Sequence, residues 1–314
     1  MTKGRIIAII TIFTLCLTGC ILHADVAETE KKEYDIQYFT DRTDQFYEYT
    51  SSTKVAFVVT TELGRYHFSD NEMPLDTVYE YMEAFEAGIS FAHEWFGQDN
   101  IKLLDLYFIQ RDLQAEYGQH GLPEGIALTG SGADGVAWVE YEYSVEPPSP
   151  FEASHVLMHE AVHALCGAHS ETSNFPKRTE GYPFYWSQLF EEGLATMLEH
   201  MYGYNSGRLH DVQYTKGGSR SSEGALDEVS NVAEALGSFA LYDMECYDFY
   251  DEFPYDILRS YGTSASFLYY LLEHNGSKED LRRVYADINL MEEVYGKDMD
   301  GMIEEWLKSL EQYK

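Results

Sequence analysis

Two histidines and a glutamate stand close together in residues 158–165, which read MHEAVHAL. His159 and His163 are four residues apart, so in a helix they lie one turn apart on the same face. Two imidazoles arranged in this way can bind one tetrahedral zinc ion. Glu160 points about 100° away from His159 around the helix axis, which places it beside the metal rather than on it. The pattern predicts a zinc site with an adjacent general base.

The segment around these residues has the marks of a well-defined helix. Ser149 can cap its first turn, Pro150 suits the first helical position, and Glu152 completes a capping box. Gly167 suits the position just beyond the end. The side opposite the most apolar residues carries His155, His159, His163 and Cys166. We therefore expect the two candidate ligands to lie on a face that does not look into the main apolar core.

A third ligand is available in residues 189–199, LFEEGLATMLE. Glu192 precedes Gly193 in a second amphipathic segment, and a carboxylate from a separate helix would complete a His2Glu set with the fourth position left for water. Glu199 follows seven residues later and lies on nearly the same helical face. We interpret Glu191 as a solvated surface acid.

These segments resemble the gluzincins, the metallopeptidase clan whose third zinc ligand is a glutamate on a helix after the His-Glu-x-x-His helix. The aminopeptidase and leukotriene-hydrolase branch has a short Asn-Glu-Gly motif with a second glutamate seven residues later; here residues 191–193 read Glu-Glu-Gly. The resemblance implies that Glu192 is the ligand and that Glu199 supports a histidine ligand. It also implies a zincin-type α+β fold, a small mixed β-sheet lobe followed by a mainly helical lobe, with the zinc cleft between them.

A further match lies in residues 260–276, SYGTSASFLYYLLEHNG. In the same branch a tyrosine before a small-residue turn opens an apolar helix and donates a hydrogen bond to the transition-state oxyanion. The resemblance assigns this role to Tyr261. A simple packing role stays open, because the chain has 26 tyrosines. Residues 292–310 are similar to the closing helices of single-domain members, so the resemblance covers residues 130–310 or so.

The sequence also departs from the aminopeptidase branch. The stretch 164–191 between His163 and Glu192 is longer than in that branch, and the Gly-x-Met-Glu-Asn motif that anchors a free amino end is absent. Residues 135–143, GVAWVEYEY, stand in its place and could bind an extended substrate by β-addition. The choice between an exopeptidase and an endopeptidase therefore stays open.

The order of the elements indicates an α+β protein. Residues 54–60, 101–109 and 135–143 have the composition of strands, and residues 75–97 have apolar positions at helical spacing. From about residue 150 onward the pattern is mostly helical. We expect a mixed sheet with one helix, followed by a helical half, in one metallopeptidase domain over residues 51–314.

The N-terminus has the pattern of a targeting segment. Lys3 and Arg5 precede an apolar run at residues 6–17, which is shorter than the roughly 20 residues of a transmembrane helix. The run ends in LTGC at residues 17–20, which resembles the bacterial lipobox. It predicts a lipoprotein signal peptide at residues 1–19, lipidation of Cys20 and a polar tether at residues 20–50. An ordinary secretory signal is the alternative.

Charge and cysteine content narrow the classes of function. A formal charge of -33 repels phosphate backbones, so we expect no nucleic-acid partner. Cys166 and Cys246 do not make a disulfide framework, and their pairing stays open. The resulting hypothesis is a zinc metallopeptidase anchored outside the cytoplasm by lipid, with one Zn²⁺ per chain and a peptide or protein substrate. The alternatives are a zinc-containing binding lipoprotein, against which Glu160 argues, and a zinc hydrolase of a non-peptide amide or ester.

Overall fold

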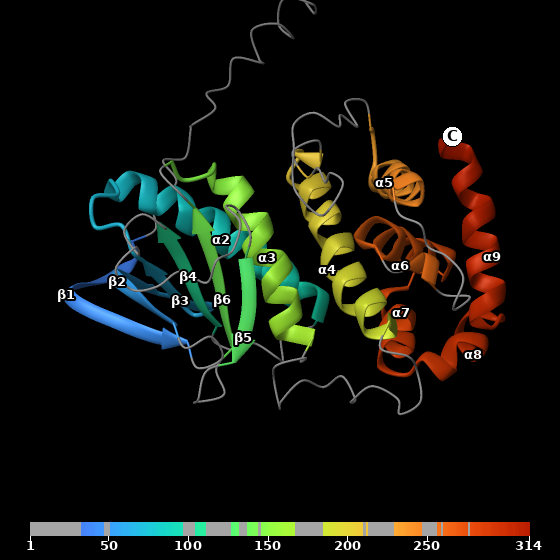
Figure 1. Ribbon diagram of the computed structural model, residues 1–314, viewed down its shortest axis with the longest axis horizontal. Coiled ribbons are helices and arrows are strands. Elements are labelled where there is room, and N and C mark those ends of the chain that lie inside the picture. Colours follow the sequence, from blue (N-terminus) through green and yellow to red (C-terminus); the bar gives the residue numbers. More distant parts are fainter. Residues whose placement is uncertain are drawn as a thin grey trace, which may run out of the picture. The chain divides into compact units, whose positions relative to one another are not determined.

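A mixed β-sheet comes first in the chain, and helices make up most of the C-terminal half (Figure 1). The computed structural model describes residues 33–46, 51–96, 104–110, 127–131, 137–143, 146–166, 185–209, 212, 229–246, 256–258, 260–275 and 277–314. Residues Asp35–Lys314 belong to one structural unit. The predicted order of a mixed sheet followed by a helical half is confirmed.

The sheet has six strands in the order β1-β2-β3-β4-β6-β5. They are β1 (Asp35–Phe46), β2 (Ser51–Thr60), β3 (Gly64–Phe68), β4 (Leu104–Gln110), β5 (Ala127–Ser131) and β6 (Ala137–Tyr143). Strand β4 runs parallel to β3 and to β6, and the other neighbours pair antiparallel. The parallel step from β3 to β4 needs a long crossover connection, which contains helix α2 (Leu75–Phe96).

Strand β1 corrects the predicted extent of the polar tether. Residues 20–50 were expected to be a tether, but residues 35–46 form β1 and pair with β2, so the prediction was wrong for this stretch. None of the side chains described in β1 is buried, because it is an outer strand of the sheet. Its sequence therefore lacks the apolar run by which β2 can be recognised.

Helices α2 and α3 cover the sheet on one side. The ring of Phe85 in α2 contacts Tyr66 of β3 and Phe108 of β4, with centroid distances of 6.1 Å and 5.6 Å. Helix α3 (Pro150–Cys166) lies against α2 and also contacts β5 and β6. A Cβ atom at Gly88 would lie 3.1 Å from the Ser154 carbonyl oxygen, so the two helices approach closely where a glycine leaves room.

The remaining helices form a second layer of packing around α6. They are α4 (Tyr185–Asn205), α5 (Val232–Cys246), η4 (Asp256–Leu258), α6 (Tyr261–Asn275), α7 (Lys278–Ala286), η5 (Ile288–Leu290), α8 (Met291–Tyr295), α9 (Met299–Ser309) and η6 (Leu310–Tyr313). Helix α6 contacts both α4 and α5, and Trp306 of α9 donates to Ser266 of α6 over 3.1 Å. One apolar cluster runs from Trp95 in α2 through α3 and α4 to Trp306, so the helical half shares its core with the end of α2.

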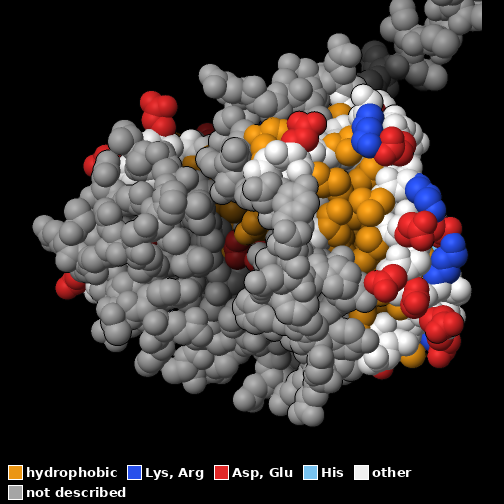
Figure 2. Space-filling model, turned by 45° about the vertical axis from the view of Figure 1, so that its right-hand side comes forward, with side chains coloured by type: hydrophobic (Ala, Val, Ile, Leu, Met, Phe, Trp, Pro, Cys, Tyr) orange, Lys and Arg blue, Asp and Glu red, His pale blue; other side chains and the backbone are white. Residues whose placement is uncertain are grey.

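Charged side chains of the C-terminal helices occur in pairs of opposite sign. Arg283 Nη2 lies 2.7 Å from Glu293 Oε1, and Lys308 Nζ lies 2.7 Å from Glu304 Oε1. On the face in Figure 2, basic and acidic side chains accordingly lie next to one another rather than in separate patches. Among the described helices, none has the length and apolar character needed to cross a membrane.

Candidate metal centre

Helix α3 presents the two candidate histidine ligands. Its predicted capping box is confirmed, because Ser149 N–H donates to Glu152 Oε2 over 2.8 Å and Glu152 N–H donates to Ser149 Oγ over 3.3 Å. The histidine face of α3 is buried, and the carboxylates of Glu192 and Glu199 lie against it. His155 is fully buried and His159 is 8% exposed, because α4 covers this face. Periodicity defines the face of a helix but not what covers it.

Glu192 of α4 lies opposite both histidines. Its Oε2 atom is 3.5 Å from Nε2 of His159 and 3.4 Å from Nε2 of His163. Ligands at 2.0–2.2 Å around a tetrahedral ion are about 3.3–3.6 Å apart, so these two separations equal the edges of such a coordination shell. Two imidazole nitrogens and one carboxylate oxygen thus converge from two helices in a way that fits one zinc ion.

Glu160 lies beside this set. Its carboxylate forms a group with His159 and His163 whose potential ligand atoms are all within 4.8 Å of one another. Two acids are therefore near the histidines. The Glu192 oxygen is the better third ligand, because it approaches both Nε2 atoms to 3.5 Å or less from a separate helix. With Glu192 as the ligand, the half-buried Glu160 carboxylate lies beside the set, where it can exchange protons with a water.

Ion-pair contacts link the histidines and the carboxylates of the site. Burial alone would lower the pKa of His159, but its hydrogen bonds to Glu192 and Glu199 outweigh burial and raise that pKa to about 10. Burial would raise the pKa of Glu192, but His159 and His163 hold it well below its usual range. The carboxylates thus favour the charged form of the imidazoles, and the imidazoles favour the charged form of the carboxylates.

Glu199 reaches the other nitrogen of His159. Its Oε2 atom is 3.1 Å from His159 Nδ1, and its side chain is fully buried. Its second oxygen, Oε1, is 3.2 Å from Nε2 of His155. No role was predicted for His155 from the sequence. The available signal was its position, one turn before His159 on the same helical face.

A glycine allows α4 to bring Glu192 and Glu199 to this place. A Cβ atom at Gly193 would lie 2.9 Å from the Ser264 Cβ atom of α6, so a larger residue would push the two helices apart. Glu192 and Glu199 are two turns apart on α4 and therefore share a face toward α3. The close contact of α4 with α6 on its other side fixes how far both carboxylates reach.

Tyr261 is the first residue of α6 and lies near His159. Its ring centroid is 6.4 Å from that of His159. The start of α6 is held by Asp243 of α5, whose Oδ2 atom accepts a hydrogen bond from the Gly262 N–H over 2.8 Å. Burial raises the pKa of Asp243, while hydrogen bonds from Ser260, Gly262 and Thr263 oppose that rise.

No protein-family model matches this sequence, and a search of curated proteins finds no similar one. The assignment of the site therefore depends on its own residues and their geometry.

Strand β6 has a different place in the sheet from the one expected for residues 135–143. It lies between β4 and β5, so its two edges are already paired and β-addition to it was a wrong expectation. Strand β5 is the outer strand on this side of the sheet in the described part of the chain, and it contacts α3. Strand β5 was not predicted from the sequence, so its antiparallel pairing with β6 was not foreseen.

The other residues singled out from the sequence lie away from the centre or outside the described part. Cys246 ends α5 and is a free, half-buried cysteine. Cys20 and Gly167 lie outside the described residues, and for Cys166 only its position as the last residue of α3 is described.

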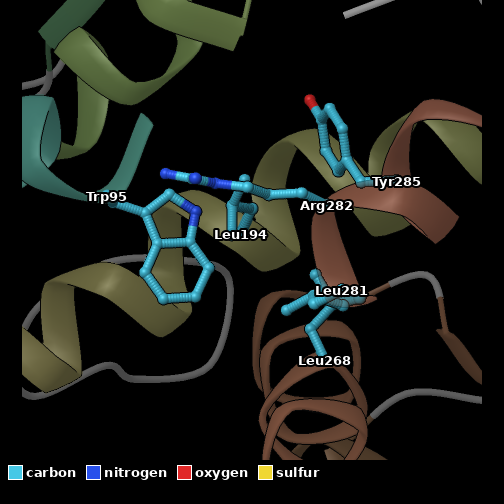
Figure 3. A pocket seen from close by; sticks show the side chains of 6 residues that line it. All are labelled: Trp95, Leu194, Leu268, Leu281, Arg282 and Tyr285. Atoms are coloured by element: carbon cyan, nitrogen blue, oxygen red, sulfur yellow. The ribbon is translucent and has the colours of Figure 1, made fainter. Parts of the chain in front are cut away.

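A small apolar cavity lies on another side of α4 (Figure 3). It is lined by Trp95, Leu194, Leu268, Leu281, Arg282 and Tyr285. Its free volume of about 10 Å³ has room for roughly one water molecule, which is too little for a peptide. Arg282 extends toward Trp95 here, and its Nε and Nη2 atoms are buried without a hydrogen-bond partner among the described residues. Neither of the two candidate histidine ligands lines this cavity, so it is separate from the candidate centre.

Proposed function

We propose that this chain is a zinc-dependent metallopeptidase. One observation carries the proposal: the Glu192 carboxylate oxygen lies 3.4–3.5 Å from two imidazole nitrogens that belong to a different helix. Glu160 beside them supplies a base that a purely structural zinc site would not need. A zincin-type arrangement, with the cleft between the sheet and the helical half, is part of the same proposal. It is supported by the contacts of α3 with both halves.

Zinc is the metal that suits this donor set best, since two imidazoles and one carboxylate leave an open tetrahedral position. When bound, zinc would polarise the scissile carbonyl and make a water molecule more acidic. His159, His163 and Glu192 would hold it. Glu199 would orient the His159 ring through the hydrogen bond at Nδ1.

The remaining steps belong to side chains and backbone of this chain. Glu160 takes a proton from the attacking water and later delivers one to the leaving amine. Tyr261 donates a hydrogen bond to the oxyanion that develops at the carbonyl. The outer strand β5, which contacts α3, offers backbone groups to an extended peptide, in the manner of β-addition.

The same proposal places the protein outside the cytoplasm. The LTGC sequence at residues 17–20 after a short apolar run supports cleavage before Cys20 and attachment of lipid to it. The substrate would then be an extracytoplasmic peptide or protein. A membrane anchor would keep the enzyme at the cell surface while its acidic domain stays in water.

A peptide library tests the proposed activity. The purified protein is incubated with mixed peptides alone, with a zinc chelator, and with zinc restored after chelation. We expect new peptide ends that disappear with chelator and return with zinc. Zinc bound without any cleavage would favour a binding protein, and cleavage that the chelator leaves unchanged would contradict a zinc peptidase.

A further inference from the structure

A third histidine is buried next to the candidate metal centre. His155 is one turn before His159 on α3 and is fully buried, as is Glu199 of α4. The Glu199 carboxylate lies between the two rings, with Oε1 3.2 Å from His155 Nε2 and Oε2 3.1 Å from His159 Nδ1. We propose that His155 is a positioning residue, which holds Glu199 in place and through Glu199 orients the ring of His159. This inference rests on the proposed zinc site.

The hydrogen bonds of His155 determine where its protons are. Nδ1 lies 3.0 Å from the Phe151 carbonyl oxygen, which can only accept, so Nδ1 carries a hydrogen. Nε2 faces a carboxylate oxygen, and two lone pairs at 3.2 Å would repel, so one proton must lie between them. This second contact is an ion-pair contact rather than a linear hydrogen bond. His155 thus links a backbone carbonyl of α3 to a side chain of α4.

Burial gives this link its importance. A carboxylate without exposure to water is costly unless its oxygens have partners. His159 supplies a partner for Oε2 alone, and His155 supplies one for Oε1. The ring of His155 is itself held in place, with its centroid 5.1 Å from that of Phe151. A Glu199 side chain held at both oxygens cannot rotate away from His159.

The consequence for the metal centre is specific. The partner of a ligating histidine fixes the tautomer and the orientation of its ring, and loss of such a partner typically costs about 10–100-fold in metal affinity or activity. Here the partner is Glu199, which is itself held in place by His155. Loss of His155 should therefore weaken zinc binding although His155 cannot reach the ion. A histidine that only packs would affect stability and leave the affinity unchanged.

Two matched substitutions separate the two bonds of His155. Gln carries an amide N–H at the distance of Nε2 and can still donate to Glu199, whereas Asn reaches only as far as Nδ1 and keeps the bond to Phe151. We expect His155→Gln to keep most of the zinc affinity. We expect His155→Asn to bind zinc about 10–100-fold more weakly. Zinc affinity is measured by competition with a chromophoric chelator, and the visible spectrum of the Co²⁺-loaded protein reports the ligand geometry.

His200→Leu is the control for a buried histidine. His200 makes the same kind of bond on α4, from Nδ1 to the Thr196 carbonyl oxygen at 2.9 Å, and its ring lies against Phe239. We expect it to lower the melting temperature while zinc affinity and the Co²⁺ spectrum stay as in the wild type. Equal affinities in wild type, His155→Gln and His155→Asn would overturn this inference and leave the proposed function standing. A wild-type chain that binds no zinc would overturn both.

Discussion

His159 is the most tightly constrained side chain of the candidate centre. Its Nε2 atom faces Glu192 and its Nδ1 atom faces Glu199, so both ring nitrogens have a carboxylate partner. A ring held in this way presents Nε2 to a metal without having to reorganise. His163 shares Glu192 with it: the Glu192 Oε2 atom is 3.4 Å from Nε2 of His163, and the two imidazole planes are 73° apart.

Replacement of Glu160 by Gln separates metal binding from catalysis. The variant keeps His159, His163 and Glu192, so we expect its zinc content to equal that of the wild type. Hydrolysis should fall by about 10²–10⁴-fold, because the group that accepts the proton is lost. Metal analysis and peptide turnover check this. Glu191→Gln is the matched control and should stay active. Wild-type turnover in Glu160→Gln would show that Glu160 is not the base.

Tyr261→Phe tests the oxyanion donor. The ring and its packing near His159 are kept, so zinc content and melting temperature should hardly change. Loss of one such donor typically lowers kcat by about 10²–10³-fold, with a smaller effect on KM. Tyr269→Phe, two turns further along α6, is the control and should leave the kinetics unchanged. If both variants are fully active, Tyr261 is a packing residue. Tyr255, six residues before Tyr261, lies outside the described residues.

At the scale of elements, helices and strands with a strong hydrophobic pattern were predicted from the sequence, and strands without one were missed. The helices that carry the site were expected from apolar spacing and capping signals, and α3 begins where Ser149, Pro150 and Glu152 indicate. Strands β1, β3 and β5 were missed. None of the described side chains of β1 is buried, so β1 lacks the apolar run that marks β2 and β4. The connection of His155 to Glu199 could not be foreseen either, since it depends on how α4 lies on α3.

Asp243 of α5 is expected to control the position of Tyr261. Its carboxylate accepts from the Gly262 N–H and so holds the first turn of α6. Asp243→Ala leaves that buried N–H without its acceptor, which should lower stability by about 1–2 kcal/mol and lower kcat, while zinc affinity stays constant. Asp243→Asn keeps one acceptor oxygen and should recover part of both. Thermal melting, kinetics and zinc titration check this, and unchanged kcat in Asp243→Ala would separate Tyr261 from this contact.

A partly buried charge network in the sheet should make stability depend on pH. Asp105 of β4 accepts from Arg65 over 2.6 Å and from His67 over 2.8 Å, and His67 also faces Asp44, which Arg42 binds. Burial would raise the pKa of Asp105, but His67 and Arg65 hold it below its ordinary value. A lowered pKa stabilises the fold above the pKa of the unfolded chain, about 4, and this stabilisation is lost as the pH falls further.

Asp105→Asn should remove that contribution. At pH 7 the variant is expected to be about 2–3 kcal/mol less stable than the wild type, because the buried His67 and the half-exposed Arg65 both lose a charged acceptor. The difference should shrink as the pH falls below about 4. Denaturant unfolding at a series of pH values measures it. A difference that stays constant down to the lowest pH would mean that the Asp105 charge does not stabilise the sheet.

At the scale of the whole molecule, the candidate centre depends on how the helical half packs against the sheet and its helices. Helix α3 contacts α2 and the sheet on one side and α4 on the other, and α4 is held in turn by α6. His159 and Glu192 therefore belong to elements from different parts of the chain. One apolar cluster extends from α2 to α9, and its contacts fix the distance between α3 and α4. A metal bound between them would add a further link between the two halves.

The location of the whole protein is tested at Cys20. If LTGC is a lipobox, Cys20→Ala should leave the chain unlipidated, so it should move from the membrane fraction to the soluble fraction or accumulate uncleaved. Cys16→Ala, inside the apolar run that cleavage would remove, is the matched control and should leave lipidation and fractionation unchanged. Peptidase activity per molecule of cleaved Cys20→Ala should equal that of the wild type, because the anchor takes no part in the chemistry. A cleaved Cys20→Ala chain that stays in the membrane fraction would rule out this anchor.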